Sequence, residues 1–404
     1  MSTADHKKPA GLYVISDGLR SLANTDEDLT RSLNGHKAGT LLSALDAVPR
    51  RRYVKQATPI ERLDNLTALL GGAELFCKRD DMLPLAGGGS KTRKLEYIVQ
   101  AALDAGADIL VTCGAVQSNH ARLTASAAAR EGLACHIILE ERVAGSFNPK
   151  ASGNNYTFAL LGATTEVVPA DGVPAAEERV MARLRAEGCR PYWVPGGGSN
   201  ALGSLGYARA ALEIIKWTNA HGAFDAIVLC SGSGGTHAGL LAGLRAAGDS
   251  TPCIGISTRA ATEPQRRKIH ALASLTAASL SDVEIPYESV IVRDAYVGPG
   301  YSLPTEEMNE AIELFARKES ILLDPVYTGK AAAGLLDLVR SGELGAGKRV
   351  LFLHTGGAPS LFHYQPIHYP PTPPAPAEEP APLGFGSLRV SAEEMAAVYG
   401  PSSQ

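Results

Sequence analysis

Short runs of apolar and β-branched residues alternate along most of the chain with longer stretches in which Ala and Leu recur at helical spacing. Such alternation predicts parallel sheets that are covered by helices. Some of the short runs, such as LFLH at 351–354, are apolar almost throughout, which is typical of strands buried on both faces. The pattern predicts an α/β fold with strands at 75–78, 109–113, 136–140, 165–168, 191–194, 227–230, 253–256 and 350–354, and helices at 93–105, 118–131, 175–187, 203–218, 236–247, 304–317 and 328–341.

The two ends of the chain differ from this central pattern. Residues 1–45 are polar and form a predicted N-terminal extension with one short helix at 25–33. Residues 366–404 form a predicted C-terminal tail, which opens with eight prolines in the 17 residues of 366–382. Proline at this density excludes helix and sheet and favours an extended, semi-rigid linker or strap.

Composition narrows the class of protein. The chain has 404 residues, 45% of them apolar, and a formal net charge of −4 from 38 basic and 42 acidic side chains. It offers neither the clustered positive charge of a nucleic-acid binder nor an apolar run of the roughly 20 residues that cross a membrane. The N-terminus has no hydrophobic signal core, and the six cysteines are scattered without a CxxC pair. We expect a soluble cytoplasmic enzyme with no nucleic-acid partner and no membrane partner.

Three glycine-rich clusters lie beside predicted elements, and two of them resemble nucleotide-binding loops only in part. GGGSKT at 87–92 has the Lys and Thr of such a loop, but Ser90 occupies the place of the last glycine and no strong strand precedes it. GELGAGK at 342–348 lacks the Ser or Thr that binds Mg²⁺, and it precedes a predicted strand instead of following one. Neither pattern favours a nucleotide site.

The third cluster, SGSGGT at 231–236, follows the apolar run AIVLC and opens a predicted helix. Free backbone N–H groups at a helix N-terminus attract an anion, and the Ser and Thr hydroxyls add donors. His237 stands where a dinucleotide site has its third glycine, so we expect one phosphate here and not a pyrophosphate. The alternative is a tight strand-to-helix turn without a ligand.

A monophosphate site and a lysine in a glycine-rich turn are the two features that pyridoxal phosphate needs. The aldehyde of the cofactor forms a Schiff base with a lysine amine, and its phosphate needs a helix terminus. Lys91 is the candidate, because the glycines at 87–89 let the backbone approach a flat cofactor closely. Taken alone, a lysine in such a turn is usually a solvated loop residue.

Five blocks of sequence carry a resemblance to a known family: KRDDMLPLAGGGSKTRKLEY, CGAVQSNHARLTA, the loop at 231–236, DPVYTGKAAAGLLDL and FLHTGGAPSLF. Between residues 53 and 364 the chain resembles the D-cysteine desulfhydrase and 1-aminocyclopropane-1-carboxylate deaminase family of pyridoxal-phosphate enzymes, in the order in which that family has these blocks. The family has the tryptophan-synthase β fold.

That fold implies two three-layer domains with open, mostly parallel, twisted sheets. A larger domain at 46–92 and 196–365 is expected to bind the phosphate, and a smaller one at 93–195 is inserted in it. The resemblance also implies a homodimer, across which the two terminal extensions could form straps.

The resemblance also implies which residues contact the cofactor. Lys91 is the implied Schiff-base lysine and moves the proton at Cα. Lys94, one helical turn on, matches a position that helps to hold the phosphate, and Asn119 matches the residue that hydrogen-bonds the ring oxygen of the cofactor. No metal site is implied. The phosphate-binding loop corresponds to Ser233, Gly234, Gly235 and Thr236.

Substrate contacts are implied at two further places. Ser118, Asn119 and His120 open a predicted helix, so their N–H groups suit the α-carboxylate of an amino acid, and Ser118 matches a position close to the substrate. Tyr301 and Tyr327 match two tyrosines beside the reacting end of the substrate. Without the resemblance, two loop tyrosines among 13 would be unremarkable.

Two threonines bear on the reaction. Next to the pyridine nitrogen of the cofactor the deaminases resemble one another in having Glu, where this chain has Thr328; before the last glycine pair they have Leu, where this chain has Thr355. A carboxylate keeps the pyridine nitrogen protonated and makes the ring a strong electron sink, whereas a neutral hydroxyl does not. A carbanion at Cα is then stabilised less, which suits β-elimination with a good leaving group better than ring opening. We expect a lyase that converts D-cysteine to pyruvate, ammonia and sulfide. The alternatives are an L-cysteate sulfo-lyase that releases sulfite, a 1-aminocyclopropane-1-carboxylate deaminase, and a protein that binds pyridoxal phosphate without turnover.

Overall fold

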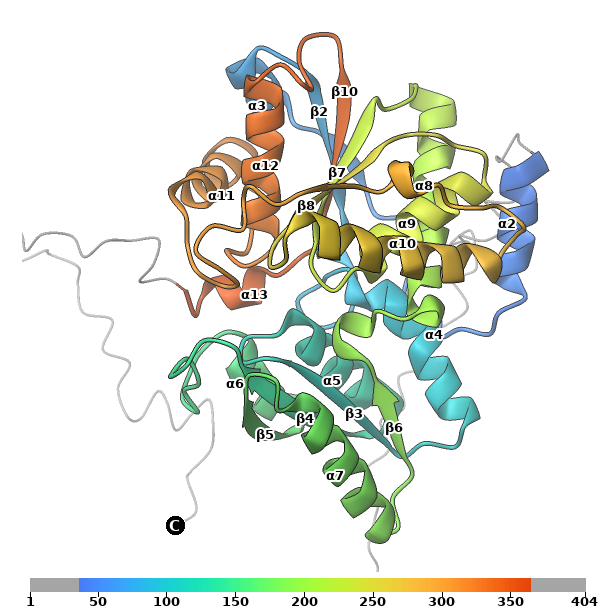
Figure 1. Cartoon of the computed structure of the whole chain (residues 1–404), viewed down its shortest axis with the longest axis vertical. Helices are drawn as coiled ribbons and strands as arrows, with labels where there is room; N and C mark the ends of the chain where they lie inside the picture. Colours follow the sequence, from blue (N-terminus) through green and yellow to red (C-terminus); the bar gives the residue numbers. More distant parts are fainter. Residues whose placement is uncertain (1–35, 365–404) are drawn as a thin grey trace, which may run out of the picture. The chain divides into compact units, whose positions relative to one another are not determined.

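Two β-sheets, each covered by helices, organise the part of the chain that the structure describes (Figure 1). The structure is a computed structural model and describes residues 36–364, without the side chain of His36. The larger sheet has six strands in the order β1-β2-β10-β7-β8-β9, and the smaller has four in the order β5-β4-β3-β6. The strands are β1 (Ile60–Arg62), β2 (Glu74–Arg79), β3 (Ile109–Ala115), β4 (Ala134–Glu141), β5 (Thr164–Pro169), β6 (Pro191–Val194), β7 (Ala226–Ser231), β8 (Cys253–Ser257), β9 (Ile291–Arg293) and β10 (Arg349–His354).

Helices lie between most of these strands, and the described strand pairs are parallel except for β1 with β2. Parallel neighbours need such crossover connections. The helices are α2 (His36–Asp46), α3 (Asp64–Leu70), α4 (Lys91–Asp104), α5 (Asn119–Glu131), α6 (Asn154–Leu160), α7 (Val173–Ala186), α8 (Ala201–His221), α9 (Gly235–Ala246), α10 (Thr262–Ala278), α11 (Glu306–Glu319), α12 (Thr328–Arg340) and α13 (Ala358–Leu361), with 3₁₀ turns η1 (Asp80–Met82), η2 (Gly196–Gly198) and η3 (Tyr287–Ser289).

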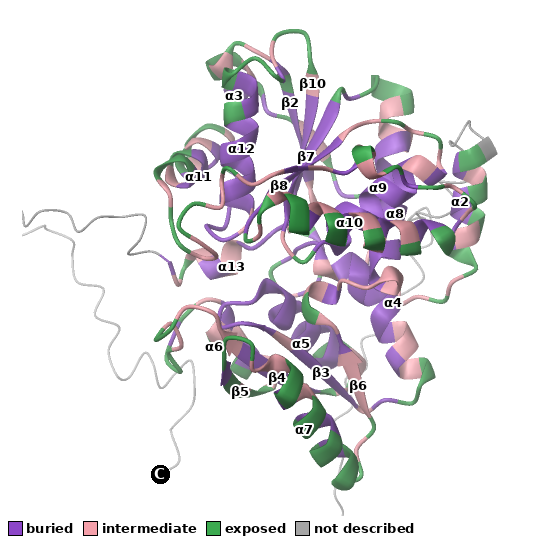
Figure 2. Cartoon of the chain, in the orientation of Figure 1, coloured by how far each residue is buried: buried purple, intermediate pink, exposed green. Residues whose placement is uncertain are grey.

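The central strands of the larger sheet are buried (Figure 2). Their alternate residues belong to core clusters with two different layers of helices. In β10, Leu351 belongs to a core cluster with residues of α8 and α9, while Phe352 belongs to one with residues of α11 and α12. In β3 of the smaller sheet, Leu110 packs with residues of α4 and α5, and Val111 packs with residues of α7. Burial on both faces explains why the predicted strands are apolar runs without polar alternation.

The α/β fold class predicted from the sequence is confirmed. All eight predicted strands and all seven predicted helices occur, with ends that shift by at most three residues. The pattern did not predict β1, β9, α2, α3, α6, α10 or α13. Strands β1 and β9 are three residues long, which is too short for an alternating pattern to stand out.

Helix α2 corrects the boundary of the predicted N-terminal extension. Its side chains Leu41, Leu42 and Leu45 are buried and share a core cluster with residues of α8 such as Leu212. Residues 36–45 are therefore part of the packed fold and not of a polar extension. The helix predicted at 25–33 and the proline-rich tail lie outside the described residues, and the division of the core into two domains stays a prediction.

Hydropathy gives no sign of a bilayer segment in the described fold: none of the helices within residues 36–364 is both long and apolar enough to cross a membrane.

Candidate active site

A cavity of about 300 Å³ is lined mainly by residues at or just after the carboxyl ends of strands in both sheets, namely β3, β4, β6, β7 and β8. This is the edge at which open α/β sheets bind ligands. Lys94, Gly235 and Thr328 do not line the cavity directly. Nine residues predicted from the sequence do line it: Lys91, Ser118, Asn119, His120, Ser233, Gly234, Thr236, Tyr301 and Tyr327.

Lys91 is the first residue of α4 and follows a loop that only glycine can form. Gly88 has a φ of +69°, and a Cβ atom there would lie 1.6 Å from the carbonyl oxygen of Asp81. The Lys91 Nζ lies 3.1 Å from Ser90 Oγ and 5.6 Å from the centre of the Tyr327 ring. Burial lowers the pKa of the Lys91 amine below its usual value, which favours the neutral form that acts as a nucleophile or base.

Residues of three segments form a cradle at the start of α9. Helix α9 begins at Gly235 without a side-chain cap, and the Gly235 N–H donates to Ser199 Oγ over 3.1 Å. Ser199 Oγ also lies 2.8 Å from Ser233 Oγ. Lys94 Nζ donates to Gly197 O at 3.0 Å and to Ser199 Oγ at 3.2 Å. Backbone amides, hydroxyls and the buried amine of Lys94 thus converge on one place, which is the kind of donor set that a phosphate takes.

The cradle leaves no room for a side chain where a phosphate would approach the backbone. A Cβ atom on Gly235 would lie 2.8 Å from Ser199 Oγ and 2.9 Å from Lys94 Nζ. Gly234 has a φ of +105°, which side chains rarely adopt. A phosphate cradle and the amine of Lys91 at one cavity fit the two ends of pyridoxal phosphate.

The start of α5 contributes the second group of backbone donors. Ser118 is its N-cap, since Ser118 Oγ accepts the Ala121 N–H over 3.1 Å. Asn119 Oδ1 accepts from Asn154 Nδ2 over 2.7 Å, which fixes the orientation of the Asn119 amide. His120 Nε2 lies 2.8 Å from Thr112 Oγ1, and burial, with Lys91 and Lys94 nearby, lowers the pKa of His120 to about 3. His120 is therefore neutral and adds no charge to a carboxylate site.

Tyr301 and Tyr327 form a pair on the cavity wall. Their hydroxyl oxygens are 2.7 Å apart, and their rings meet edge to face with centres 5.9 Å apart. Burial raises the pKa of both phenols, so both are protonated near neutral pH. The guanidinium of Arg142 lies over the Tyr301 ring, with its Cζ 4.7 Å from the ring centre.

A model of the family described as "Pyridoxal-phosphate dependent enzyme" matches residues 52–356. The chain belongs to this family. It is 45% identical over 331 residues to a D-cysteine desulfhydrase of Yersinia enterocolitica, in an alignment that spans 81% of this chain and 99% of the relative. It is 43% identical over 327 residues to a D-cysteine desulfhydrase of Klebsiella pneumoniae, with 80% and 99% covered.

Solved structures agree with the fold of this pyridoxal-phosphate-dependent enzyme. The crystal structure of an ACC deaminase homologue matches with a TM-score of 0.75 and 37% identity, over 81% of this chain and 98% of that one. A hydrogen sulfide-producing enzyme of Fusobacterium nucleatum matches at a TM-score of 0.52 and 15% identity, with 78% and 98% covered, which shows the fold alone. Pyridoxal phosphate is the cofactor of the enzyme.

In this pyridoxal-phosphate-dependent enzyme the two threonines that bear on the reaction lie behind the cavity wall. Thr328 is fully buried, and its hydroxyl donates to Asp324 Oδ2 and accepts the Asp324 N–H, each over 2.8 Å. Thr355 Oγ1 lies 3.1 Å from the Sγ of Cys230, and Cys230 does line the cavity. A contact between Thr328 and the cofactor stays a prediction.

Sequence reasoning missed several residues of the site. Ser199 completes the phosphate cradle, and its signal was the glycine-rich run PGGGSN after β6. Lys268 donates to Gly232 O over 3.0 Å and, like Arg142 and Arg259, lines the cavity. These three cations come from segments without a local motif, so only the tertiary fold could reveal them.

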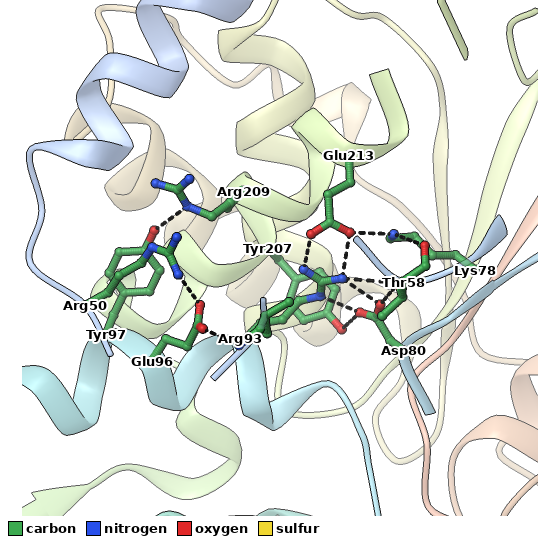
Figure 3. A network of polar contacts seen from close by, with 11 residues as sticks. Arg50, Thr58, Lys78, Asp80, Arg93, Glu96, Tyr97, Tyr207, Arg209 and Glu213 are labelled. Carbon is green, nitrogen blue, oxygen red and sulfur yellow. Dashed lines mark hydrogen bonds and ion pairs between the residues drawn. The ribbon is translucent and has the colours of Figure 1, made fainter. Parts of the chain in front are cut away.

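A buried ionic network anchors α4 through Arg93 (Figure 3). Arg93 binds the carboxylate of Asp80 through Nε over 2.8 Å and that of Glu213 through Nη1 over 2.6 Å. Lys78 Nζ also binds Glu213, over 2.7 Å. Two cations and two anions thus balance, and they connect the start of α4 to β2, η1 and α8.

Proposed function

We propose that this chain is a D-cysteine desulfhydrase, which converts D-cysteine and water to pyruvate, ammonia and hydrosulfide by β-elimination. The proton on Cα is removed, the Cβ–S bond breaks, and sulfur leaves with the bonding electron pair as hydrosulfide. Water then hydrolyses the released enamine to pyruvate and ammonia. Bound pyridoxal phosphate supplies an electron sink for the negative charge that develops at Cα.

Each step has a candidate group on the cavity wall. Lys91 takes the Cα proton, because burial lowers the pKa of its amine and so favours the neutral form that general-base work needs. Backbone N–H groups at the start of α5, at Ser118, Asn119 and His120, bind the substrate carboxylate. The protonated pair of Tyr301 and Tyr327 lies beside the departing sulfur and can donate a hydrogen bond or a proton to it.

The observation that carries this proposal is the placement of Lys91, the cradle at the start of α9 and the tyrosine pair around one cavity. Similarity to D-cysteine desulfhydrases at 43–45% identity, over 99% of their length, supports the choice of substrate. The neutral Thr328, at the position where the deaminases resemble one another in having Glu, supports elimination over ring opening. Thr355, where they have Leu, is a second difference from the deaminases.

Product analysis on four substrates tests the proposal. Purified holoenzyme is incubated separately with D-cysteine, L-cysteine, L-cysteate and 1-aminocyclopropane-1-carboxylate, and sulfide, sulfite, pyruvate and 2-oxobutyrate are measured. We expect sulfide and pyruvate in equal amounts from D-cysteine, at a kcat/KM at least tenfold above that for every other substrate. A larger kcat/KM for cysteate or for the cyclopropane amino acid would contradict it.

We also propose that the enzyme is a cytoplasmic homodimer, to which the segments 1–35 and 366–404 could contribute straps. The six cysteines are all unpaired in the structure, as suits a reducing compartment. Light scattering coupled to gel filtration distinguishes a dimer of the 42.2 kDa chain from a monomer, and the same measurement on a chain that ends at residue 365 tests the C-terminal strap.

A further inference from the structure

A side chamber of about 160 Å³ adjoins the candidate active site. Three residues, Ala115, Arg142 and Tyr301, line both the chamber and the main cavity. The chamber therefore adjoins the main cavity beside Tyr301, where the reacting end of a substrate is expected, and none of its lining residues belongs to the phosphate cradle of α9.

Arg142 is the only formally charged side chain that lines this chamber at neutral pH, among the residues that the structure describes. The one other titratable base on its wall, His363, has a pKa that burial lowers below its usual value, so it is neutral. The chamber also contains hydroxyl groups, such as Ser302 Oγ, 3.0 Å from the hydroxyl of Tyr364. A small polar chamber with one fixed cation suits an anionic group.

The guanidinium of Arg142 is held in place by two contacts, but these do not occupy all of its hydrogen-bond donors. Its Nε donates to the carboxylate of Glu140, and its face stacks on the ring of Tyr301. Within residues 36–364 its hydrogen bonding involves Nε alone, which leaves both Nη groups to a ligand. Its side chain keeps 24% of its surface accessible while Glu140 keeps 12%, so the carboxylate is the more buried partner and the arginine is the one that faces the cavities.

The charges around the main cavity lead to the same conclusion. Besides the buried amine of Lys91, its lining includes three cationic side chains, Arg142, Arg259 and Lys268, and no carboxylate among the described residues. Lys268 binds the Gly232 carbonyl beside the phosphate cradle, so a bound phosphate accounts for the charge at that end. Arg142 lies beside Tyr301, and both residues also line the side chamber, whose lining includes no other charged side chain among the described residues.

We propose that Arg142 is a specificity-determining residue that binds a negatively charged group on the β-carbon of the substrate, with the side chamber as the space for that group. This inference rests on the proposed function, because it places the substrate with its β-carbon toward the tyrosine pair. Among amino acids whose β-substituent cannot leave, the site then prefers an anionic β-substituent, such as a carboxylate, over a neutral one of similar size.

Inhibition by unreactive amino acids tests this proposal. Aspartate carries a β-carboxylate that cannot leave, and asparagine is its neutral counterpart of the same size; both enantiomers of each are assayed as competitive inhibitors of D-cysteine turnover. We expect aspartate to bind at least tenfold more tightly than asparagine, because hydrogen bonds to a charged partner contribute roughly ten- to a hundredfold in affinity. In Arg142→Gln the ratio falls to about one, and Arg142→Lys restores part of it.

Two further variants separate this role from simpler ones. Arg259→Gln removes another cavity cation and is expected to change both inhibition constants by the same factor, so that their ratio is kept. Glu140→Gln keeps Arg142 and removes its competing anion, and we expect the ratio to stay or to rise even if Arg142→Gln does not fold. If Arg142 acts only by adjusting the acidity of Tyr301, the two inhibitors weaken equally in Arg142→Gln, and the proposal is wrong.

The same ligands titrated against the visible absorption of the holoenzyme give a binding readout that needs no turnover. An Arg142-dependent preference for aspartate in that titration, without sulfide from D-cysteine, would overturn the proposed reaction and keep the anion site. Sulfide release from D-cysteine with an equal affinity for aspartate and asparagine would keep the proposed reaction and overturn the anion site.

Discussion

Asp324 shows how one buried carboxylate can shape a catalytic wall. Its Oδ1 accepts the backbone N–H groups of Val326 and Tyr327 over 2.9 and 2.8 Å, and its Oδ2 accepts the N–H and hydroxyl of Thr328 over 3.1 and 2.8 Å. These bonds serve the first orphan donors of α12, whose N-cap Tyr327 provides no side-chain cap. Asp324 thereby fixes the backbone that presents Tyr327 to the cavity.

Thr328→Glu tests the role that we assign to a neutral residue at this position. The new carboxylate would be buried beside Asp324, whose Oδ2 lies 2.8 Å from the present hydroxyl, and it would favour a protonated pyridine nitrogen on the cofactor. We expect kcat for sulfide release from D-cysteine to fall at least tenfold. Thr328→Ser keeps the bonds to Asp324 and should retain activity; full activity in Thr328→Glu would refute the argument from the pyridine nitrogen.

Individual residues differ in how far sequence alone could place them. Ser118 was predictable as a helix cap, and it is one, because the signal and the contact lie within the same turn. Lys91 and Gly234 could be predicted because each lies in a glycine-rich loop, where the absence of side chains itself indicates that a ligand approaches the backbone. Arg142 and Lys268 were not, since each meets the cavity only through the packing of distant elements.

Helix α4 carries both the reactive Lys91 and Arg93, which belongs to the buried ionic network. Lys91 and Lys94 lie one turn apart on one face, and Arg93 points to the other, where it binds Asp80 and Glu213 (Figure 3). A carboxylate buried in this way is stabilised only while its cation remains. The network is therefore a device that holds the start of α4, and with it Lys91, against β2 and α8.

Arg93→Met is expected to lower the free energy of unfolding by about 3–5 kcal/mol, because it removes the cation that pairs with the buried Asp80 and leaves Glu213 with Lys78 alone. It should also weaken the affinity for pyridoxal phosphate, since α4 carries both Lys91 and Lys94. Urea titration of the holoenzyme and cofactor titration of the apoenzyme measure the two effects.

The matched control for that prediction is Arg183→Met. Arg183 pairs with Glu187 on the surface of α7, where the side chains keep 45% and 50% of their area exposed. Exposed pairs at this spacing contribute about 0.3–0.5 kcal/mol. Equal losses of stability in the two variants would show that the buried network does not anchor α4.

Periodicity predicted the elements that are buried and long, and it failed for the others. Strands β3, β7 and β10 are buried on both faces, and each was evident in the sequence as a short, nearly continuous run of apolar residues. Helix α2 was assigned to a polar extension because its burial depends on contacts of Leu41 and Leu45 with the distant helix α8. Helix α10 was missed because its consecutive basic residues at 266–268 hide the apolar positions that face the core.

Buried histidines make the stability of the whole molecule depend on pH. Burial lowers the pKa of His120 to about 3 and that of His237 to about 4, whereas the ordinary value is near 6.5. Well above pH 6.5 neither the folded nor the unfolded state binds these protons. Below it the unfolded state takes them up first, so the folded state loses stability as the pH falls toward about 4.

We therefore expect the free energy of unfolding to decrease between pH 6 and pH 4.5 by about 1.4 kcal/mol per pH unit for each of the two histidines. Replacement of His237, which is fully buried, by Asn should remove its own share of this slope, about 1.4 kcal/mol per pH unit. Urea titrations at pH 7, 6, 5 and 4.5 measure it. A free energy that stays constant over this range would show that the buried rings are protonated in the folded state.

The decisive measurement concerns Lys91 and uses two readouts on one sample. Wild-type enzyme and Lys91→Ala, each loaded with pyridoxal phosphate, are compared for visible absorption and for sulfide release from D-cysteine, with the exposed Lys150→Ala as control. We expect the lysine-linked absorption band and the sulfide release to be lost together in Lys91→Ala and kept in Lys150→Ala. An unchanged band, or sulfide release at the wild-type rate from Lys91→Ala, would contradict the assignment of this cavity as the active site.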